Sequence, residues 1–172
     1  MNHKTVCFTG HRQIPISQYA LIKESLTGII THLIMNGYCF FGTGGAIGFD
    51  TLAAHIILSL KKLYPHIRLI LVLPCICQTQ NWNRKNILEY ENIKSQADKI
   101  VYTQQEYSID CMYKRNRHLV NNSSVCICYL TKATGGTAYT VRYAREKGLS
   151  IINVADKKIT SCYTAKGDSG RN

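Results

Sequence analysis

Short unbroken apolar runs alternate along this chain with longer segments of helical period, and this alternation limits the folds open to it. The runs "KTVCFTG", "IRLILVLP" and "SVCICYL" are typical of strands that are covered on both faces. Between the first two, Leu26, Ile29, Ile30 and Leu33 repeat at the spacing of an amphipathic helix. This order indicates repeated βαβ units. We therefore predict a single doubly wound α/β domain, with a mostly parallel sheet of about six strands and helices on both faces.

The predicted elements cover most of the chain. Strands are expected over residues 4–10, 38–42, 67–74, 99–103, 124–130 and 150–154, and helices over 50–62, 83–96, 111–123 and 135–148. A further helix should begin at a Ser17 cap and end at Gly37 in the C′ position. The domain is expected to span 1–155, and the tail over 156–172, rich in Lys, Ser, Gly and Asp, to be disordered.

Composition indicates a globular protein of the cytosol. The 172 residues are 45% hydrophobic and 18% charged, and neither a membrane span nor a secretion signal is evident. We therefore expect a cytoplasmic protein without a membrane partner. The eight cysteines are expected to stay reduced. The pairs Cys75/Cys77 and Cys126/Cys128 have CxC spacing without a following His, so no metal site is predicted.

The formal net charge of +11 favours anionic partners. Nucleotides, DNA and RNA all fit this balance, as does a basic surface with no specific partner. Charge alone leaves these alternatives open.

Ligands of a doubly wound sheet bind at the carboxyl ends of its strands, so the loops there hold the candidate residues. The first loop is "TGHR", in which Thr9, Gly10, His11 and Arg12 supply a hydroxyl, a bare backbone and two cationic donors. A capped turn with a surface arginine is the alternative interpretation.

The second loop is "GTGGAIGFD", which places Gly42, Gly44, Gly45 and Gly48 before a predicted helix. Such a backbone lets amides approach an oxyanion. No Lys follows, so the loop is not the phosphate loop of an NTPase. Asp50 at the helix start either accepts a ribose hydroxyl or caps the helix. The alternative is a tight turn that packs strand against helix.

The third loop is "TKATGGTAYT", where Gly135 and Gly136 open another helix among threonine hydroxyls. Two glycine-rich helix starts indicate two anionic sites or the two ends of one pyrophosphate. In "MYKRNR", Arg115 and Arg117 are candidates to clamp phosphates, unless they belong to a solvated helix face.

Groups suited to catalysis are scarce. Only Asp50 and Asp110 among the ten carboxylates fall near these loops, and no Ser, His and Asp set is evident. Trp82 could stack on a base or pack in the core. We identify no confident catalytic residue; Asp50 and Arg115 are the candidates if the protein is an enzyme.

Over residues 5–154 the ordered motifs "CFTGHR", "GGAIGFDTLAA", "ILVLPC", "NW", "CMYKRNRHLV" and "GGTAYTVRYAREKG" resemble the SLOG superfamily of Rossmann-like proteins, and closely its YpsA-like branch. The resemblance implies binding of nucleotide derivatives such as NAD and ADP-ribose, and for some members a sensor role in bacterial and phage conflict. Residue chemistry and resemblance together give these candidate ligand-binding residues: Thr9, Gly10, His11, Arg12, Gly42, Thr43, Gly44, Gly45, Gly48, Asp50, Pro74, Trp82, Arg115, Asn116, Thr134, Gly135, Gly136 and Thr137.

Two further families share single motifs. "GGAIGFDTLAAH" is similar to "GLARGID-TAAH" of DNA-processing protein A, which binds single-stranded DNA, but Ile47 replaces the Arg. The Lonely Guy phosphoribohydrolases use an Arg in "MHERK", matched by Arg115, and a Glu in "PGGxGTxxE", where Arg142 stands here. A cation at that position disfavours glycosidic cleavage.

We therefore predict a protein that senses or sequesters a nucleotide-derived small molecule, of the ADP-ribose, NAD or cyclic ADP-ribose type, without turnover and without a required cofactor. The alternatives are a hydrolase of an N-glycosidic or phosphate bond in such a ligand, and a nucleic-acid-binding protein. A homodimer or larger homo-oligomer is compatible with this interpretation.

Overall fold

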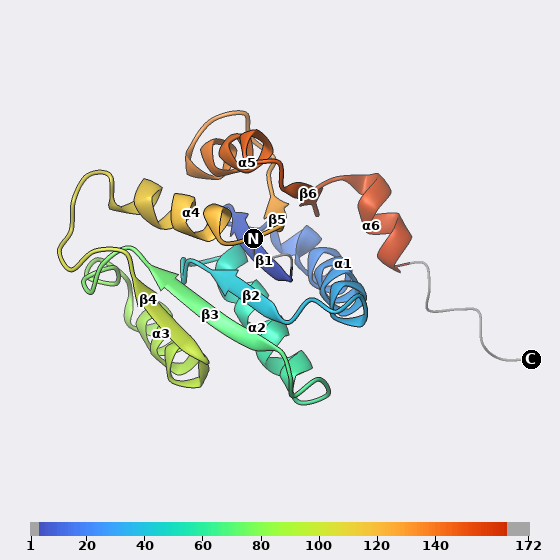
Figure 1. Ribbon diagram of the computed structural model, residues 1–172, viewed down its shortest axis with the longest axis horizontal. Helices are drawn as coiled ribbons and strands as arrows, with labels where there is room; N and C mark the ends of the chain where they lie inside the picture. The colour runs from blue at the N-terminus through green and yellow to red at the C-terminus, as the bar shows by residue number, and fades with distance from the viewer. Residues whose placement is uncertain (1–3, 165–172) are drawn as a thin grey trace, which may run out of the picture.

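Six parallel strands form one sheet in the order β4-β3-β2-β1-β5-β6 in the computed structural model, which describes residues 4–164 (Figure 1). All five pairs of neighbouring strands are parallel, as the unbroken apolar runs predicted. The strands are β1 (Thr5–Gly10), β2 (Phe40–Thr43), β3 (Arg68–Leu73), β4 (Lys99–Tyr102), β5 (Val125–Tyr129) and β6 (Ser150–Asn153).

Helices cover both faces of this sheet. In Figure 1, α1, α2 and α3 lie on one side of it and α4 and α5 on the other. The helices are α1 (Ile16–Met35), α2 (Phe49–Lys61), α3 (Arg84–Gln96), α4 (Cys111–Asn121), α5 (Gly136–Glu146) and α6 (Lys157–Thr164). The predicted doubly wound α/β fold is therefore confirmed.

Two hydrophobic cores flank the sheet. The larger contains Phe8, Phe41 and Ile127 with the apolar stripes of α1 and α2. The smaller packs Cys7 and Cys126 with side chains of α4 and α5. Each large apolar side chain that is fully buried contributes about 1.5–3 kcal/mol to stability. All eight cysteines are free thiols, and those of the smaller core pack as small hydrophobes.

The two ends of α1 differ in how well the sequence predicted them. Gly37 follows the helix with φ +83°, and its amide donates to the Ile34 carbonyl, so the expected C′ glycine is confirmed. The expected Ser17 cap is wrong. The N-cap is Pro15, two residues earlier, and its fixed φ of −55° sets the entry to a helix that begins at Ile16.

The tail was expected to be disordered from residue 156, but α6 begins at Lys157. The Asp156 carboxylate accepts a hydrogen bond from the Lys158 amide at 2.9 Å. Ile159 and Tyr163 then pack against the larger core, and Tyr163 lies beside Gly28 of α1. These apolar contacts give the segment a reason to fold. The rest of the predicted tail, 165–172, lies outside the described residues.

The strand order reverses between β1 and β5. The chain proceeds from β1 toward β4 on one side of this point and from β5 to β6 on the other. Loops leaving adjacent strands on opposite sides of a reversal part from each other, which opens a crevice at the carboxyl ends of β1 and β5. Among residues 4–164, no helix combines the length and apolarity that crossing a membrane would need.

Candidate functional site

A cavity of about 310 Å³ opens at this reversal point and brings the three predicted loops together. Its walls come from the end of β1, the loop after β2, one side of α4 and the first residues of α5. The lining residues are Phe8, Thr9, Gly10, His11, Arg12, Ala46, Asp50, Met112, Arg115, Asn116, Gly136 and Thr137.

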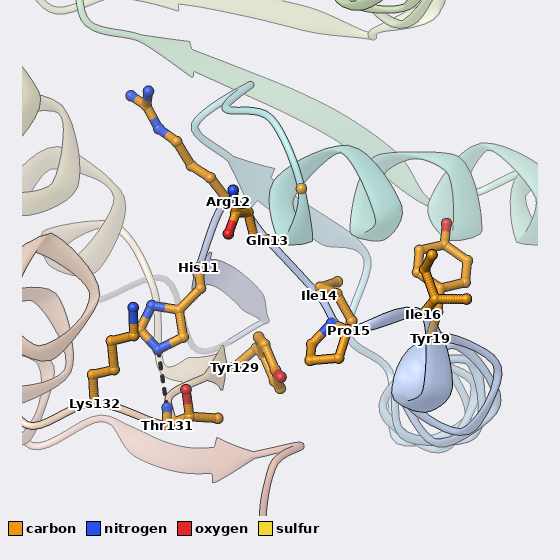
Figure 2. Close-up of a pocket in the computed structure, with 11 residues that line it drawn as sticks. His11, Arg12, Gln13, Ile14, Pro15, Ile16, Tyr19, Tyr129, Thr131 and Lys132 are labelled. Atoms are coloured by element: carbon orange, nitrogen blue, oxygen red, sulfur yellow. Dashed lines mark hydrogen bonds between the residues drawn. The ribbon is translucent and has the colours of Figure 1, made fainter.

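A larger cavity of about 830 Å³ adjoins the first and shares His11 and Arg12 with it (Figure 2). Its remaining walls are more apolar and come from Gln13, Ile14, Pro15, Ile16, Tyr19, Gly48, Tyr129, Thr131 and Lys132. The Arg12 side chain extends away from the other residues drawn in Figure 2. The two neighbouring cavities thus differ in character: the smaller is polar and cationic, and the larger is lined by rings and aliphatic side chains.

Arg115 and Asp50 form a buried pair beneath the smaller cavity. Their exposed fractions are 7% and 5%, and Arg115 Nη1 lies 3.8 Å from Asp50 Oδ2. The Asp50 oxygen also accepts from the amides of Gly44, at 3.1 Å, and Ala46, at 3.3 Å. Burial raises the pKa of Asp50, against the opposing effect of Arg115 and the two amides. This carboxylate therefore holds the loop after β2 and the guanidinium in place.

The Arg115 guanidinium is only partly paired. One Nη donates to the Gly44 carbonyl and the other approaches the sulfur of Met112 at 3.7 Å. Its Nε is buried and finds no hydrogen-bond acceptor within residues 4–164. Burial lowers the pKa of Arg115, Asp50 raises it and Arg12 lowers it. An arginine remains charged in proteins, so a buried cation with a spare donor lines the cavity.

The glycines after β2 have reasons within the protein for lacking a side chain. A Cβ added to Gly44 would lie 1.6 Å from Arg115 Nη1. At Gly48, where φ is +88°, it would lie 2.3 Å from the Arg12 carbonyl oxygen. Gly48 also precedes α2 as its N-cap. Close packing of this loop against Arg12 and Arg115 therefore accounts for both glycines.

The glycines before α5 differ from these. Apart from the adjoining residues of the chain and of the same helix, no atom of the described residues lies within 4 Å of a Cβ added to Gly135 or Gly136. Gly135 has φ +97°, whereas Gly136 has no such backbone requirement. No described side chain caps α5, whose first amides point beyond the helix end. Gly136 and Thr137 thus present a bare helix N-terminus to the smaller cavity.

His11 ties the two sides of the crevice together. Its Nε2 accepts a hydrogen bond from the Thr131 amide at 3.0 Å, and its ring meets the edge of Tyr129 at 5.7 Å (Figure 2). Because an amide can only donate, the ring carries no proton at Nε2. Burial lowers the pKa of His11, and the charge of Lys132 lowers it further. A neutral imidazole therefore links β1 to the loop after β5.

Residues 6–157 match the YspA SLOG family. This chain belongs to that family. The predicted SLOG resemblance is thus confirmed, over almost the same residues.

Among sequence relatives of this SLOG protein, a UPF0398 protein of Staphylococcus epidermidis is 32% identical over 102 residues, covering 55% of this chain and 54% of that protein. An uncharacterized SPbeta prophage-derived protein of Bacillus subtilis is 29% identical over 139 residues, covering 73% and 81%. A UPF0398 protein of Bacillus cereus is 25% identical, with 84% of each chain covered. The chain spans about half the length of the first of these relatives.

Among solved structures, DNA processing protein A from Helicobacter pylori, whose single-stranded DNA binding mode has been described, matches with TM-score 0.61 and 20% identity. The match covers 86% of this SLOG chain and 63% of the other. DNA processing protein A from Streptococcus pneumoniae matches with TM-score 0.60 and 16% identity, covering 87% and 49%. At these identities the likeness shows a shared fold.

Several candidate residues of the SLOG chain line neither cavity: Gly42, Thr43, Gly44, Gly45, Pro74, Trp82, Thr134 and Gly135. Trp82 packs edge-on against Tyr90 at 5.5 Å, beside the larger core. Gly44 nevertheless acts on the site, because its amide holds Asp50 and its carbonyl accepts from Arg115. The ligand roles of these residues stay predictions.

The fold adds residues to the site that were not among the named candidates. Tyr129, Thr131 and Lys132 line the larger cavity at the end of β5. Thr131 and Lys132 begin the predicted loop "TKATGGTAYT", so their place at a strand end was a usable signal. Ile14 and Tyr19 come from the segment that follows "TGHR". Their side chains carried no such signal, since apolar residues near a helix start are usual in any α/β domain.

Proposed function

We propose that this SLOG protein binds a phosphorylated nucleotide derivative of the ADP-ribose, NAD or cyclic ADP-ribose type and returns it unchanged. The observation that carries the proposal is the partly paired guanidinium of Arg115 opposite the uncapped start of α5. A protein that binds such a ligand without reacting with it acts as a sensor of the ligand or sequesters it.

The smaller cavity suits a phosphate group. Arg12 and Arg115 supply two positive charges, while Gly136 and Thr137 supply amides at a helix N-terminus. Because Arg115 is buried, water screens its charge weakly, and the guanidinium attracts a phosphate group placed in this cavity. Of the described lining residues, only Asp50 carries a carboxylate, and its charge is engaged by Arg115 and two amides.

The larger cavity suits a base or a ribose. Its volume of about 830 Å³ lies within the roughly 300–1,000 Å³ that is usual for small-molecule sites. Tyr129, Tyr19 and Ile14 supply rings and apolar surface, and Lys132 supplies a charge at the rim. Because the two cavities meet at His11 and Arg12, one ligand with a phosphate and a base can span both.

Binding without turnover is favoured by the state of Asp50. A carboxylate that already accepts two amide hydrogen bonds and pairs with Arg115 is poorly placed to act as a general base or nucleophile. Arg142, at the position of the phosphoribohydrolase Glu, is exposed on α5 and lines neither cavity. The hydrolase alternative therefore finds no carboxylate free to serve it among the described lining residues.

Calorimetric titration with ADP-ribose, NAD and cyclic ADP-ribose tests the proposal, with adenosine as the probe that lacks phosphate. We expect saturable heat with at least one phosphorylated compound and much weaker binding of adenosine. Heat from none of the three at sub-millimolar concentration would contradict the proposal.

Mass spectrometry of the same mixtures after long incubation distinguishes binding from hydrolysis. The proposal predicts that the ligand is recovered intact, whereas free base, ribose phosphate or nucleoside monophosphate would favour the hydrolase. If oligonucleotides displaced the small ligand, the alternative that this cavity binds nucleic acid would gain support.

A further inference from the structure

Much of the positive charge of this protein lies outside the two cavities. The chain carries a formal net charge of +11, of which the smaller cavity uses Arg12 and Arg115. α4 and α5 together hold five Lys or Arg residues and one carboxylate, Glu146. The exposed cations on them and directly after α5 are Lys114, Arg117, Arg142, Arg145 and Lys147. This excess of positive charge lies on the exposed surface of α4 and α5.

Tyrosine rings alternate with the cations on this surface. Arg117 of α4 lies over Tyr139 and Tyr143 of α5, with Cζ 5.8 Å and 5.6 Å from the two ring centroids. Lys147 Nζ lies over the Tyr143 ring, 5.3 Å from its centroid. Tyr113 of α4 meets Tyr139 edge-on at 4.6 Å. Arg145 is exposed on α5 between Tyr143 and Lys147. We call these six residues the α4–α5 ladder: Tyr113, Arg117, Tyr139, Tyr143, Arg145 and Lys147.

The ladder is held in place before any partner arrives. Arg117 Nε donates to the Tyr139 hydroxyl at 2.6 Å, and the Tyr143 hydroxyl donates to Asn121 Oδ1 at 2.9 Å. The rings of Tyr139 and Tyr143 are nearly parallel, with 4° between their planes. Tyr113 is 45% exposed, so part of its ring faces solvent. Rings that are fixed in advance lose little conformational entropy when a flat group stacks on them.

We propose that the α4–α5 ladder binds single-stranded nucleic acid. An unpaired base stacks on the exposed ring of Tyr113, and the phosphodiester backbone follows the exposed Lys and Arg side chains that lie over the other two rings. The inference goes beyond the proposed small-molecule function, because no ladder residue lines either cavity. Duplex DNA hides its base faces and would use the charges alone. An acidic peptide would likewise leave the rings unused.

Fluorescence anisotropy with labelled oligodeoxyuridylate and oligouridylate tests the proposal. The two oligonucleotides differ only in the sugar, so the one that binds more tightly identifies the preferred sugar. The charge-reversed variant Arg117→Glu with Arg145→Glu should lose at least about ten-fold in affinity. Each phosphate contact on a single strand adds about 0.7 to the magnitude of the slope of log K against log salt concentration. Loss of two contacts should therefore reduce the magnitude of this slope by about 1.4.

The matched control is Arg84→Glu with Lys85→Glu, which changes the net charge equally at the start of α3, where carboxylates are tolerated. We expect this control to bind both oligonucleotides nearly as tightly as wild type. Equal losses in the two variants would overturn the proposal, because net charge and not the ladder would then decide. Binding of neither oligonucleotide to wild type would also overturn it.

The variant Tyr113→Leu tests stacking without changing charge. We expect affinity to fall about five-fold or more with the salt slope unchanged. An unchanged affinity, together with equally effective competition by oligoglutamate, would overturn the proposal in favour of an acidic protein partner. Titration of the Arg117→Glu, Arg145→Glu variant with ADP-ribose separates the two proposals, since it should leave small-molecule binding intact.

Discussion

Asp50 and Arg115 form the pair on which the site depends most at the scale of single residues. Both are buried, and the carboxylate also holds the amides of Gly44 and Ala46. Removing one member of a buried ion pair leaves the other charge uncompensated, which costs about 3–5 kcal/mol. Asp50→Ala should therefore lower the free energy of unfolding by about that amount in urea denaturation. Glu146→Ala, an exposed carboxylate at the end of α5, is the control and should change it little.

His11 gives the stability of this protein a dependence on pH. Its pKa is lowered in the folded protein, so between that value and the ordinary pKa the unfolded chain binds more protons. The stability that neutral His11 contributes is therefore present above its ordinary pKa and lost as pH falls through the lowered one. Protonation of Nε2 also removes the acceptor for the Thr131 amide.

The measurement is the melting temperature of wild type and His11→Ala between pH 7.5 and pH 5, values chosen to bracket a histidine pKa of about 6.5. We expect wild type to lose more stability than the variant on acidification. Equal losses would show that the contact between His11 and Thr131 is not a pH-sensitive link.

At the scale of elements, the starts of α2 and α5 have different reasons for their glycines. Gly44→Ala would force its methyl group onto the Arg115 guanidinium and should destabilise the fold by about 1–3 kcal/mol. Gly136→Ala meets open space and should leave stability unchanged or raise it by about 0.4–1 kcal/mol. Thermal denaturation of the two variants compares them directly. If Gly136→Ala unfolded as readily as Gly44→Ala, the two loops would not differ as described.

Most helices and strands could be predicted from the sequence. Apolar runs and helical spacing were enough for the six strands and for α1 to α5, because burial imposes these patterns. The pairing of Gly44 and Arg115 was not predictable, since only the crossover of α4 brings them together. α6 was missed because its few apolar residues, Ile159 and Tyr163, gain significance only from their contact with α1 and the core.

At the scale of the whole molecule, the strand order explains where the site lies. Three loops that are far apart in sequence meet because β1, β2 and β5 are adjacent and parallel. The candidate residues Thr9, Asp50, Arg115 and Gly136 could thus be assigned to one region from the predicted fold alone. The division into a phosphate part and a base part required the side-chain positions, and with them the two adjoining cavities.

The proposal also predicts separate effects on binding and on folding. Gly136→Pro removes the first amide of α5 at a helical position that tolerates proline, and it should weaken binding of ADP-ribose about ten-fold or more, since one charge-assisted hydrogen bond contributes about 1.5–3 kcal/mol. Arg142→Ala, an exposed cation on the same helix, is the control and should bind like wild type. Calorimetry on the two variants measures this difference, and equal affinities would place the phosphate elsewhere.

The most direct test is a nuclear magnetic resonance titration that follows the Nε–H of Arg115 and the amides of Gly136 and Thr137 as ADP-ribose is added. We expect all three signals to shift together and saturate, because a phosphate bound in the smaller cavity lies against the buried guanidinium and accepts from the amides at the start of α5. Signals that stay in place at saturating ligand, while others move elsewhere in the protein, would contradict it.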